Sequence, residues 1–522
     1  MLTTLRKTGW ASALTHTLSY LAALPTATSL FSSPASASDA SPSWASSIES
    51  ELGPLLAPSA QILLPSSPDF PTYNERWSET GRPTYAVIIT VTNENDVSAA
   101  VKYANKHDIP FLATTGAHGT WHGLDKLQNG MAIYMRGINH FDLSLDGKSV
   151  TFGGGVRGTD VVNNLWAVGK QTVSGACTCV SVAGPALGGG HGFLQGQYGL
   201  LADQIIGARA VLADGEVVVA TEDENADLLW ALKGAGHNFG IVTEFQYRVY
   251  DAVKPDWAYE FLFFSGDKVE ELYEVHNEMM EYQPAEAVQW SVWRMDPEVD
   301  PVNPIISLFV FHNGGMEALV EYTEKLHNVG PYHSFSGITP YVNLSRVAGF
   351  DLDGAVCQHL NSVSVFPADV EKFDIPAMRA WFNEFSNMLS EEPALQGSFC
   401  LVEGYSTQAV RAIPQESTAF PHRNKNLLLA PLITHSVLGN KTLDDIAFAW
   451  GERQRNVIYP DASTRHSYVN YAAGSETVEQ LYGYVNFWRV EKLKALKEKY
   501  DPKGRFGWFA PIIRDSELED EL

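Results

Sequence analysis

The feature that most constrains this chain is a glycine-dense segment between Gly175 and Gly199. Glycine lacks a Cβ atom and reaches positive φ freely, so such a segment lets the backbone pass close to a flat or phosphate-bearing ligand. The bulky residues Phe193 and Tyr198 interrupt it, which argues against a merely flexible loop. The run Gly188-Gly189-Gly190-His191-Gly192 does not have the glycine order of a Rossmann turn. The segment therefore predicts a cofactor loop of a non-Rossmann fold.

A strand–helix–strand unit precedes this segment. Tyr85 to Val91 is a β-branched run typical of a buried strand, and Asn93 can cap the helix that follows it. A second strand, Phe111 to Thr115, ends on Gly116. Further strands are predicted at Ser149 to Gly153, Ala208 to Leu212 and Glu216 to Thr221, the last two joined by an Asp214-Gly215 hairpin signal.

From Trp257 onwards, strand-like runs alternate with amphipathic helices. The strands are predicted at 257–264, 288–294 and 305–311, and the helices near 269–280 and 316–326. This pattern favours an α+β domain with an antiparallel sheet covered by helices on one face. The 522 residues fit two packed domains. Four aromatic residues alternate along these strands and suit either a cleft lining or a core: Trp290, Trp293, Tyr259 and Phe261.

The charge of the chain limits its partners. Its net charge of −25 and pI near 4.9 repel phosphate backbones and anionic lipids. No segment approaches the roughly 20 apolar residues that a membrane-spanning helix needs. We therefore expect neither nucleic acid nor a membrane as a partner. The expected partner is a small-molecule substrate, and the expected oligomeric state is a monomer.

The N-terminus has the layout of a secretory signal over residues 1–37. Arg6 and Lys7 precede a mostly apolar stretch, and the small residues Ala35-Ser36-Ala37 follow it. The alternative is a disordered leader of a cytosolic protein. If the chain is secreted, Asn343 and Asn440 are glycosylation acceptors.

The cysteines are too few for a disulfide framework: Cys177, Cys179, Cys357 and Cys400. Cys177 and Cys179 are separated by one residue, which is poor geometry for a mutual disulfide. A zinc site would need a second such pair, and the sequence has none, so no metal is predicted. At least one of these two cysteines needs another explanation.

Two motifs flank the cofactor loop. Thr115-Gly116-Ala117-His118 ends the second strand, and Gly175-Ala176-Cys177 precedes the run at Gly188. With them, the stretch from Pro83 to about Tyr250 resembles the PCMH-type FAD-binding domain of the vanillyl-alcohol oxidase and p-cresol methylhydroxylase superfamily. The likeness is closest to berberine bridge enzymes and the fungal oxidases of that group.

Other motifs extend the resemblance in chain order. They are Tyr198-Gly199-Leu200 with Ala202-Asp203-Gln204, the stretch from Asp227 to Gly240, Phe420-Pro421-His422-Arg423, Tyr468-Val469-Asn470-Tyr471, and Asn486-Phe487-Trp488-Arg489. The resemblance implies an FAD domain at residues 75–250, a substrate domain at 251–459, and a C-terminal segment at 460–512 that returns to the FAD domain.

The resemblance also implies covalent FAD, bonded to His118 at the flavin's ring methyl and to Cys177 at its benzenoid edge. The implied activity is an oxidase that moves a hydride from a small alcohol or amine, a fungal secondary metabolite, to FAD and then to O2, giving H2O2. The alternatives are a carbohydrate oxidase and a flavin-dependent cyclase. The expected cofactor-binding residues are His118, Cys177, Thr115, Gly116, Ala117, Gly184, Gly188, Gly189, Gly190, Asn238, Gly240, Asn470 and Asn486.

The sequence departs from the family pattern in two places. Ala117 stands where the family prefers glycine, and the loop is one residue longer, so His122 rivals His118. His118 is preferred because of its distance from the end of the strand. The strand at 427–433 lacks the glutamate base of plant members. Tyr468 is therefore the candidate base and Tyr471 its rival, although a phenol with a pKa near 10 would need that pKa depressed.

Overall fold

The computed structural model describes residues 44–359, 361–425, 427–483 and 487–513. The predicted signal over residues 1–37 and the predicted cofactor-binding residue Asn486 lie outside these ranges. The described residues form four-, five- and eight-stranded sheets flanked by helices, which confirms the predicted α+β class. None of the helices in these ranges is long and apolar enough to cross a membrane.

The four-stranded sheet contains the predicted strand–helix–strand unit. Its order is β1 (Gln61–Leu63), β2 (Tyr85–Thr90), β4 (Gly130–Tyr134), β3 (Phe111–Thr114). Helix α4 (Glu94–Lys106) connects β2 to β3, and the Asn93 side chain caps it by accepting from the Asp96 backbone N–H. Strands β2 and β3 both run parallel to β4. The chain leaves β3 at Thr114 and enters the loop that carries His118.

The five-stranded sheet is antiparallel throughout. Its order is β5 (Phe141–Leu143), β6 (Ser149–Gly153), β10 (Ile241–Arg248), β8 (Ile205–Val211), β9 (Val217–Thr221). The predicted hairpin joins β8 to β9, and its Gly215 has a φ of 85°, which explains the glycine at that turn. The loops from β7 (Lys170–Gln171) to β8 contain the glycine-dense segment.

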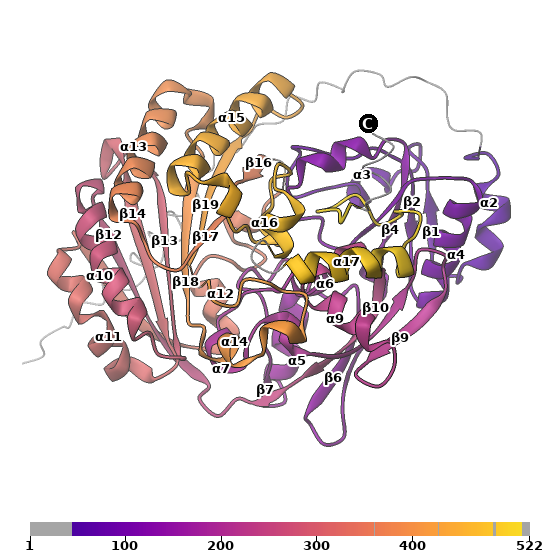
Figure 1. Cartoon of the computed structure of the whole chain (residues 1–522), viewed down its shortest axis with the longest axis horizontal. Helices are drawn as coiled ribbons and strands as arrows, with labels where there is room; N and C mark the ends of the chain where they lie inside the picture. The colour runs from indigo at the N-terminus through magenta and orange to yellow at the C-terminus, as the bar shows by residue number, and fades with distance from the viewer. Residues whose placement is uncertain (1–43, 360, 426, 484–486, 514–522) are drawn as a thin grey trace, which may run out of the picture.

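The eight-stranded antiparallel sheet lies beside these two (Figure 1). Its order is β15 (His333–Pro340), β12 (Asp256–Phe264), β14 (Asp300–His312), β13 (Ala287–Asp296), β18 (Phe399–Tyr405), β19 (Leu427–His435), β16 (Ser362–Val365), and β17 (Ala368–Val370) also pairs with β19. Helices α10 (Val269–Glu281), α11 (Gly315–Val329), α13 (Ile375–Glu391) and α15 (Lys441–Ile458) cover its outer face.

Side chains alternate between the two faces of this sheet. Trp293 on β13 lies under the helices, with its ring centroid 4.3 Å from that of Trp381 on α13. Trp290, an odd number of residues away, points to the inner face, towards the smaller sheets. Of the four predicted aromatic strand residues, Trp293 is in the core under the helices, whereas Tyr259, Phe261 and Trp290 belong to the inner cluster, and only Trp290 lines the large cavity there.

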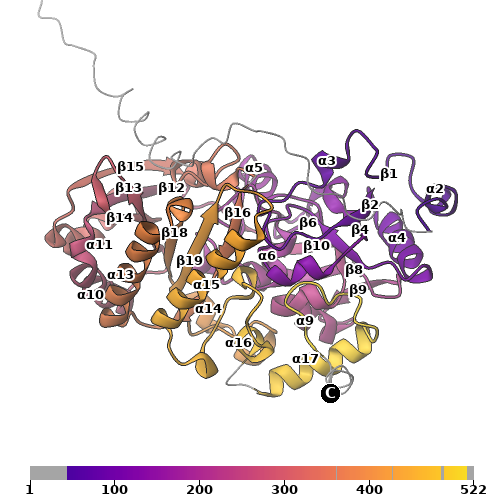
Figure 2. The ribbon, with the colours of Figure 1, turned by 90° about the horizontal axis from the view of Figure 1, so that it is seen from above.

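The C-terminal segment packs against the first half of the chain. Helix α17 (Phe487–Tyr500) lies beside α9 (Ala226–Ala235) in both views of the ribbon (Figures 1 and 2). The Tyr500 hydroxyl donates to Asp227 Oδ1 at 2.8 Å, where α9 begins. This is the contact expected of a segment that returns to the FAD domain. The boundaries predicted at residues 75, 250, 459 and 512 stay predictions.

Candidate active site

A cavity of about 500 Å³ lies between the inner face of the eight-stranded sheet and the two smaller sheets. Its walls come from the loop after β3, the loop of residues 175–187, strands β13 and β18, and the C-terminal segment. Most of the predicted site residues line it: Thr115, Gly116, Ala117, His118, Cys177, Gly184, Gly240, Tyr468, Asn470 and Tyr471. Residues far apart in the chain thus meet at one place.

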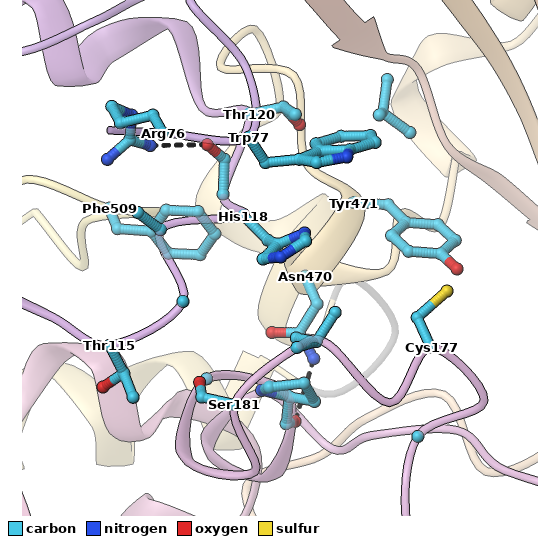
Figure 3. A pocket seen from close by; sticks show the side chains of 18 of the residues that line it. Arg76, Trp77, Thr115, His118, Thr120, Cys177, Ser181, Asn470, Tyr471 and Phe509 are labelled. Carbon is cyan, nitrogen blue, oxygen red and sulfur yellow. Dashed lines mark hydrogen bonds between the residues drawn. The ribbon is translucent and has the colours of Figure 1, made fainter. Parts of the chain in front are cut away.

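His118 points into this cavity (Figure 3). Its ring stacks on that of Trp77 at 5.5 Å between centroids, and the Trp77 backbone N–H donates to the Ala117 carbonyl. Burial lowers the pKa of His118 to about 3, so the imidazole is neutral. Ala117 has a φ of 51°, a left-handed conformation that explains the family's preference for glycine and costs an alanine about 1 kcal/mol.

His122, the rival of His118, lies elsewhere. Its Nε2 is 2.8 Å from the Ser364 hydroxyl, and its ring packs 4.6 Å from that of Phe448 on α15. The structure therefore brings His118, and not His122, to the cavity. The longer loop turns away into a 3-10 helix at His122–Lys126, which the sequence alone did not indicate.

Cys177 faces the same cavity from the opposite loop (Figure 3). It is a free thiol, and burial together with the negative charge of Glu403 raises its pKa to about 12. Cys179 forms a disulfide with Cys357, 178 residues further along the chain. The two neighbouring cysteines thus have different roles: Cys177 faces the cavity, and Cys179 ties its loop to the other half of the molecule.

The sequence analysis missed Glu403, which lines the cavity. Its Oε2 accepts a hydrogen bond from the Tyr471 hydroxyl and its Oε1 one from the Tyr405 hydroxyl, both at 3.1 Å. Burial raises the pKa of Glu403 to about 7. A carboxyl poised near neutral pH and bonded to a phenol can accept a proton from a bound molecule.

A signal for Glu403 was present in the sequence. In the run Phe399-Cys-Leu-Val-Glu-Gly-Tyr405, an acid interrupts an otherwise apolar strand. Strand β19 has no acid, as predicted, but Glu403 on β18 pairs directly with Leu428 of β19. Phe399, Leu401, Glu403 and Tyr405 face the cavity, whereas Cys400 and Val402 pack under the helices. The acid is therefore one strand away from the expected position.

The two candidate tyrosines differ in their surroundings. The Tyr468 hydroxyl accepts from the Gly190 backbone N–H at 3.1 Å and from Asn470 Nδ2 at 2.7 Å, which ties it to the glycine run. The Tyr471 hydroxyl bonds to Glu403 instead. Burial raises the pKa of both phenols, and the charge of Glu403 raises it further. Neither phenol therefore has the lowered pKa that a tyrosine base would need, whereas the pKa of Glu403 is about 7.

The run from Gly188 to Gly190 lies behind the cavity wall. A Cβ atom at Gly188 would overlap the amide of Asn470, one at Gly189 the ring of Phe420, and one at Gly190 the side chain of Leu201. These glycines allow segments of the protein to pack closely. This geometry does not support the expectation that these glycines approach the cofactor, because neighbouring protein atoms fill the space beside them.

Asn238 is also placed away from the cavity. Its Nδ2 donates to the Tyr482 hydroxyl and the Ala510 carbonyl, and its Oδ1 accepts from the Ile512 N–H. The amide is thus fully used in holding the C-terminal segment, so its side chain does not reach a cofactor. Asn470, in contrast, lines the cavity and also donates to the Pro185 carbonyl at 2.9 Å.

A buried ion pair joins two of the sequence motifs. Arg423 Nη2 lies 2.7 Å from Asp203 Oδ1 and Arg423 Nη1 lies 3.1 Å from Asp203 Oδ2, with both side chains at most 2% exposed. Removing one partner of such a pair leaves the other charge buried and unpaired, which lowers the free energy of unfolding by about 3–5 kcal/mol. These motifs therefore join the two halves of the chain next to the cavity.

The residues of this cavity fit an FAD. Five buried polar atoms of its lining residues have no hydrogen-bond partner among the described residues: Arg76 Nε, Thr114 Oγ1, His191 Nε2, His237 Nδ1 and Trp290 Nε1. Buried polar atoms normally find a partner, so these indicate a polar ligand or ordered water. Backbone from Thr115 to Thr120 and at Gly184 and Gly240 borders the space. The neutral imidazole and the free thiol are the two groups that could bond to it.

Comparisons with known proteins agree with this picture. Residues 85–221 match the family described as FAD binding domain. The chain is 41% identical to FAD-linked oxidoreductase chyH of Penicillium rubens, over 88% of this chain and 93% of the relative. Among solved structures it resembles Physcomitrella patens BBE-like 1, with a TM-score of 0.76 and 21% identity over 90% of this chain and 99% of that one.

A second solved structure bears on the cofactor. It is glucooligosaccharide oxidase from Acremonium strictum, which has a 6-S-cysteinyl, 8α-N1-histidyl FAD. The TM-score is 0.75 at 20% identity, covering 90% of this chain and 100% of that one. At this identity the likeness concerns the fold.

Proposed function

Because this chain belongs to the fungal FAD-linked oxidoreductases of the berberine bridge enzyme-like family, we propose that it is an oxidase for a small alcohol or amine of secondary metabolism. The observation that carries the proposal is the hydrogen-bonded pair of Tyr471 and Glu403 in the wall of the cavity that His118 and Cys177 also line. A proton acceptor beside a flavin site is what hydride removal from a carbinol or amine carbon requires.

The residues of the pair have separate tasks. Bound FAD supplies the acceptor for the hydride and, with O2, yields H2O2. Tyr471 holds its proton at rest, since burial raises its pKa. As Tyr471 Oη takes the proton of the substrate's hydroxyl or amine, its own proton passes to Glu403 Oε2, 3.1 Å away. The Tyr405 hydroxyl donates to Glu403 Oε1 and stabilises the ionised carboxylate that starts this transfer.

The part of the cavity formed by the eight-stranded sheet supports an apolar substrate. Its lining side chains include Trp290, Val292, Met295, Val365, Leu401 and Leu432. Arg294, a charged side chain in this part, is engaged by Asp296 at 3.1 Å. Such walls favour a ring system with one polar reacting group, because a sugar buries hydroxyls on every side and would leave them unpaired.

This lining also ranks the alternatives. A carbohydrate oxidase is supported by fold likeness at about 20% identity and is disfavoured by the apolar wall. A flavin-dependent cyclase would use the same cavity, and only its product distinguishes it.

The proposed function predicts a specific response to a substrate panel. Under anaerobic conditions, ring-bearing alcohols or amines should bleach the flavin absorbance, and in air each turnover should release one H2O2. Oligosaccharides should do neither, and Glu403→Gln protein serves as the impaired control. Bleaching by oligosaccharides alone would establish a carbohydrate oxidase, and ring closure without H2O2 would establish a cyclase.

We also propose that FAD is bound covalently through His118 and Cys177. Both side chains face one cavity from opposite loops, and one is a neutral imidazole and the other a free thiol (Figure 3). The doubly linked FAD of the Acremonium oxidase, in a protein of the same fold, agrees with this assignment.

We further propose that the protein is secreted. The Cys179–Cys357 disulfide fits an oxidising compartment, and Asn343 and Asn440 are both exposed. Protein isolated from its native host should begin after Ala27 or Ala37 and carry glycan at Asn343 or Asn440. N-terminal sequencing and mass analysis before and after glycosidase treatment would check this. An intact Met1 would contradict it.

A further inference from the structure

A second cavity, of about 300 Å³, lies behind the loop that carries His118. Thr114, Thr115 and His118 line both cavities, so the loop is the partition between them. Several buried polar atoms on the wall of the second cavity, Asn74 Oδ1 and Thr114 Oγ1 among them, have no hydrogen-bond partner among the described residues. Unpaired buried oxygens around a space this large indicate ordered water.

His359 reaches His118 from the side of this second cavity. The two rings meet edge to face, with centroids 6.1 Å apart. His359 Nδ1 lies 3.7 Å from Glu75 Oε2, and both residues line the second cavity. The Glu75 carboxylate therefore lies beside the His359 imidazole on the wall of this cavity. A water between the two rings would connect them for proton transfer.

The other charged neighbours of His118 cannot accept a proton. Besides His359, the groups whose charge acts on His118 are Arg76 and Arg157. Guanidinium groups keep their protons at any ordinary pH. Trp77 stacks on His118, but its indole N–H can only donate a hydrogen bond, and it donates to the Val356 carbonyl at 2.8 Å. Among the described groups whose charge acts on His118, His359 is therefore the one that can accept a proton.

The disulfide holds His359 in this position. Cys357 lies two residues before His359 and is bonded to Cys179, two residues after Cys177. A hydrogen bond from the Thr178 N–H to the Phe350 carbonyl at 3.0 Å joins the same two loops. The segment of residues 350–359 is thus fastened to the Cys177 loop, while its Val356 carbonyl holds the tryptophan that covers His118.

We propose that His359, beside Glu75 and held by the Cys179–Cys357 disulfide, takes the proton that His118 loses when it bonds to the flavin. The inference rests on the proposed covalent FAD. In that reaction a C–H bond of the flavin's ring methyl is replaced by a C–N bond to His118. One proton leaves the methyl carbon and one leaves the imidazole, two electrons enter the flavin ring, and O2 removes them as H2O2. His359 receives the imidazole proton and passes it to the water of the second cavity.

Peptide mass mapping of the purified full-length protein tests this proposal. In wild-type protein both the His118 and the Cys177 peptides should carry flavin. In His359→Gln protein the Cys177 peptide should still carry it, whereas attachment at His118 should be slower on the order of 10²–10⁴-fold. His327→Gln is the matched control, because His327 also pairs with a carboxylate, Glu260 at 2.9 Å, on remote helix α11.

Chemical rescue distinguishes a role of His359 as proton acceptor from a purely structural role. Incubating His359→Gln protein with FAD, O2 and imidazole should restore the His118 link, which a packing defect would not allow. The proposal would be overturned if His359→Gln protein attached flavin to His118 as fast as wild-type protein does. It would also be overturned if imidazole did not restore a slowed attachment. The Cys179→Ser/Cys357→Ser variant should also link His118 more slowly, and wild-type linkage there would refute the role of the disulfide. A wild-type protein without flavin on His118 would instead refute the proposed covalent FAD.

Discussion

Replacing Glu403 by glutamine is expected to slow anaerobic reduction of the flavin by substrate on the order of 10²–10⁴-fold. Glutamine keeps the size of the side chain and its contact with the Tyr405 and Tyr471 hydroxyls, but it cannot take a proton. Stopped-flow absorbance measures the reduction directly. Because the amide preserves the packing of β18, the thermal midpoint and the flavin content should stay close to those of wild type.

The dependence of this rate on pH follows from the pKa of Glu403, about 7. The proton acceptor must be ionised, so the wild-type rate should rise with pH up to about 7 and then level off. Glu403→Gln protein should lack this rise. Tyr405→Phe removes a hydrogen bond that lowers the pKa of Glu403, so its profile should move to higher pH and reach a similar plateau.

Two tyrosine variants distinguish the proposed pair from the alternative base. Tyr471→Phe breaks the path to Glu403 and should lower the plateau of the reduction rate at every pH. Tyr468→Phe removes a hydroxyl that accepts from the glycine run and should have the smaller effect on the rate. If Tyr468→Phe slows reduction by 10²-fold or more while Glu403→Gln does not, the base is Tyr468 and the proposed pair is wrong.

The second large effect concerns retention of the cofactor. Acid-denatured wild-type protein should keep its FAD, and His118→Ala and Cys177→Ala proteins should each keep it through the remaining link. Only the double variant should release all of it, because no covalent bond then survives the loss of the fold. The checks are absorbance of the precipitated protein and intact mass.

Two matched controls accompany this test. His122→Ala removes the rival histidine, which bonds to Ser364 outside the cavity, and should leave both links in place. Cys400→Ala removes the other free thiol, which is buried under the helices, and should do the same. Release of FAD from the wild-type protein in acid would contradict the covalent assignment. Loss of a link in His122→Ala protein would show that His122, and not His118, bonds to the flavin.

Local patterns in the sequence were sufficient for some of these features. The β-branched run at Tyr85, the cap at Asn93 and the Asp214-Gly215 turn each depend on near neighbours, and each forms as predicted. The family motifs were sufficient to indicate His118 and Cys177. The α+β class followed in the same way, since the spacing of apolar residues sets which face of a helix or strand is buried.

Packing between distant segments decided the rest. Glu403 lies in the cavity because β18 pairs with β19 in a register that turns its odd-numbered side chains inward, and a strand's sequence does not state which face will meet a ligand. Cys179 forms a disulfide with Cys357, 178 residues away in the chain. Asn238 Oδ1 accepts a hydrogen bond from the Ile512 N–H, because the C-terminal segment packs against the first half of the chain. The sequence alone determined the local elements and the two groups proposed to bond the flavin. The proton acceptor and the disulfide needed the tertiary structure, since each depends on residues that only folding brings together.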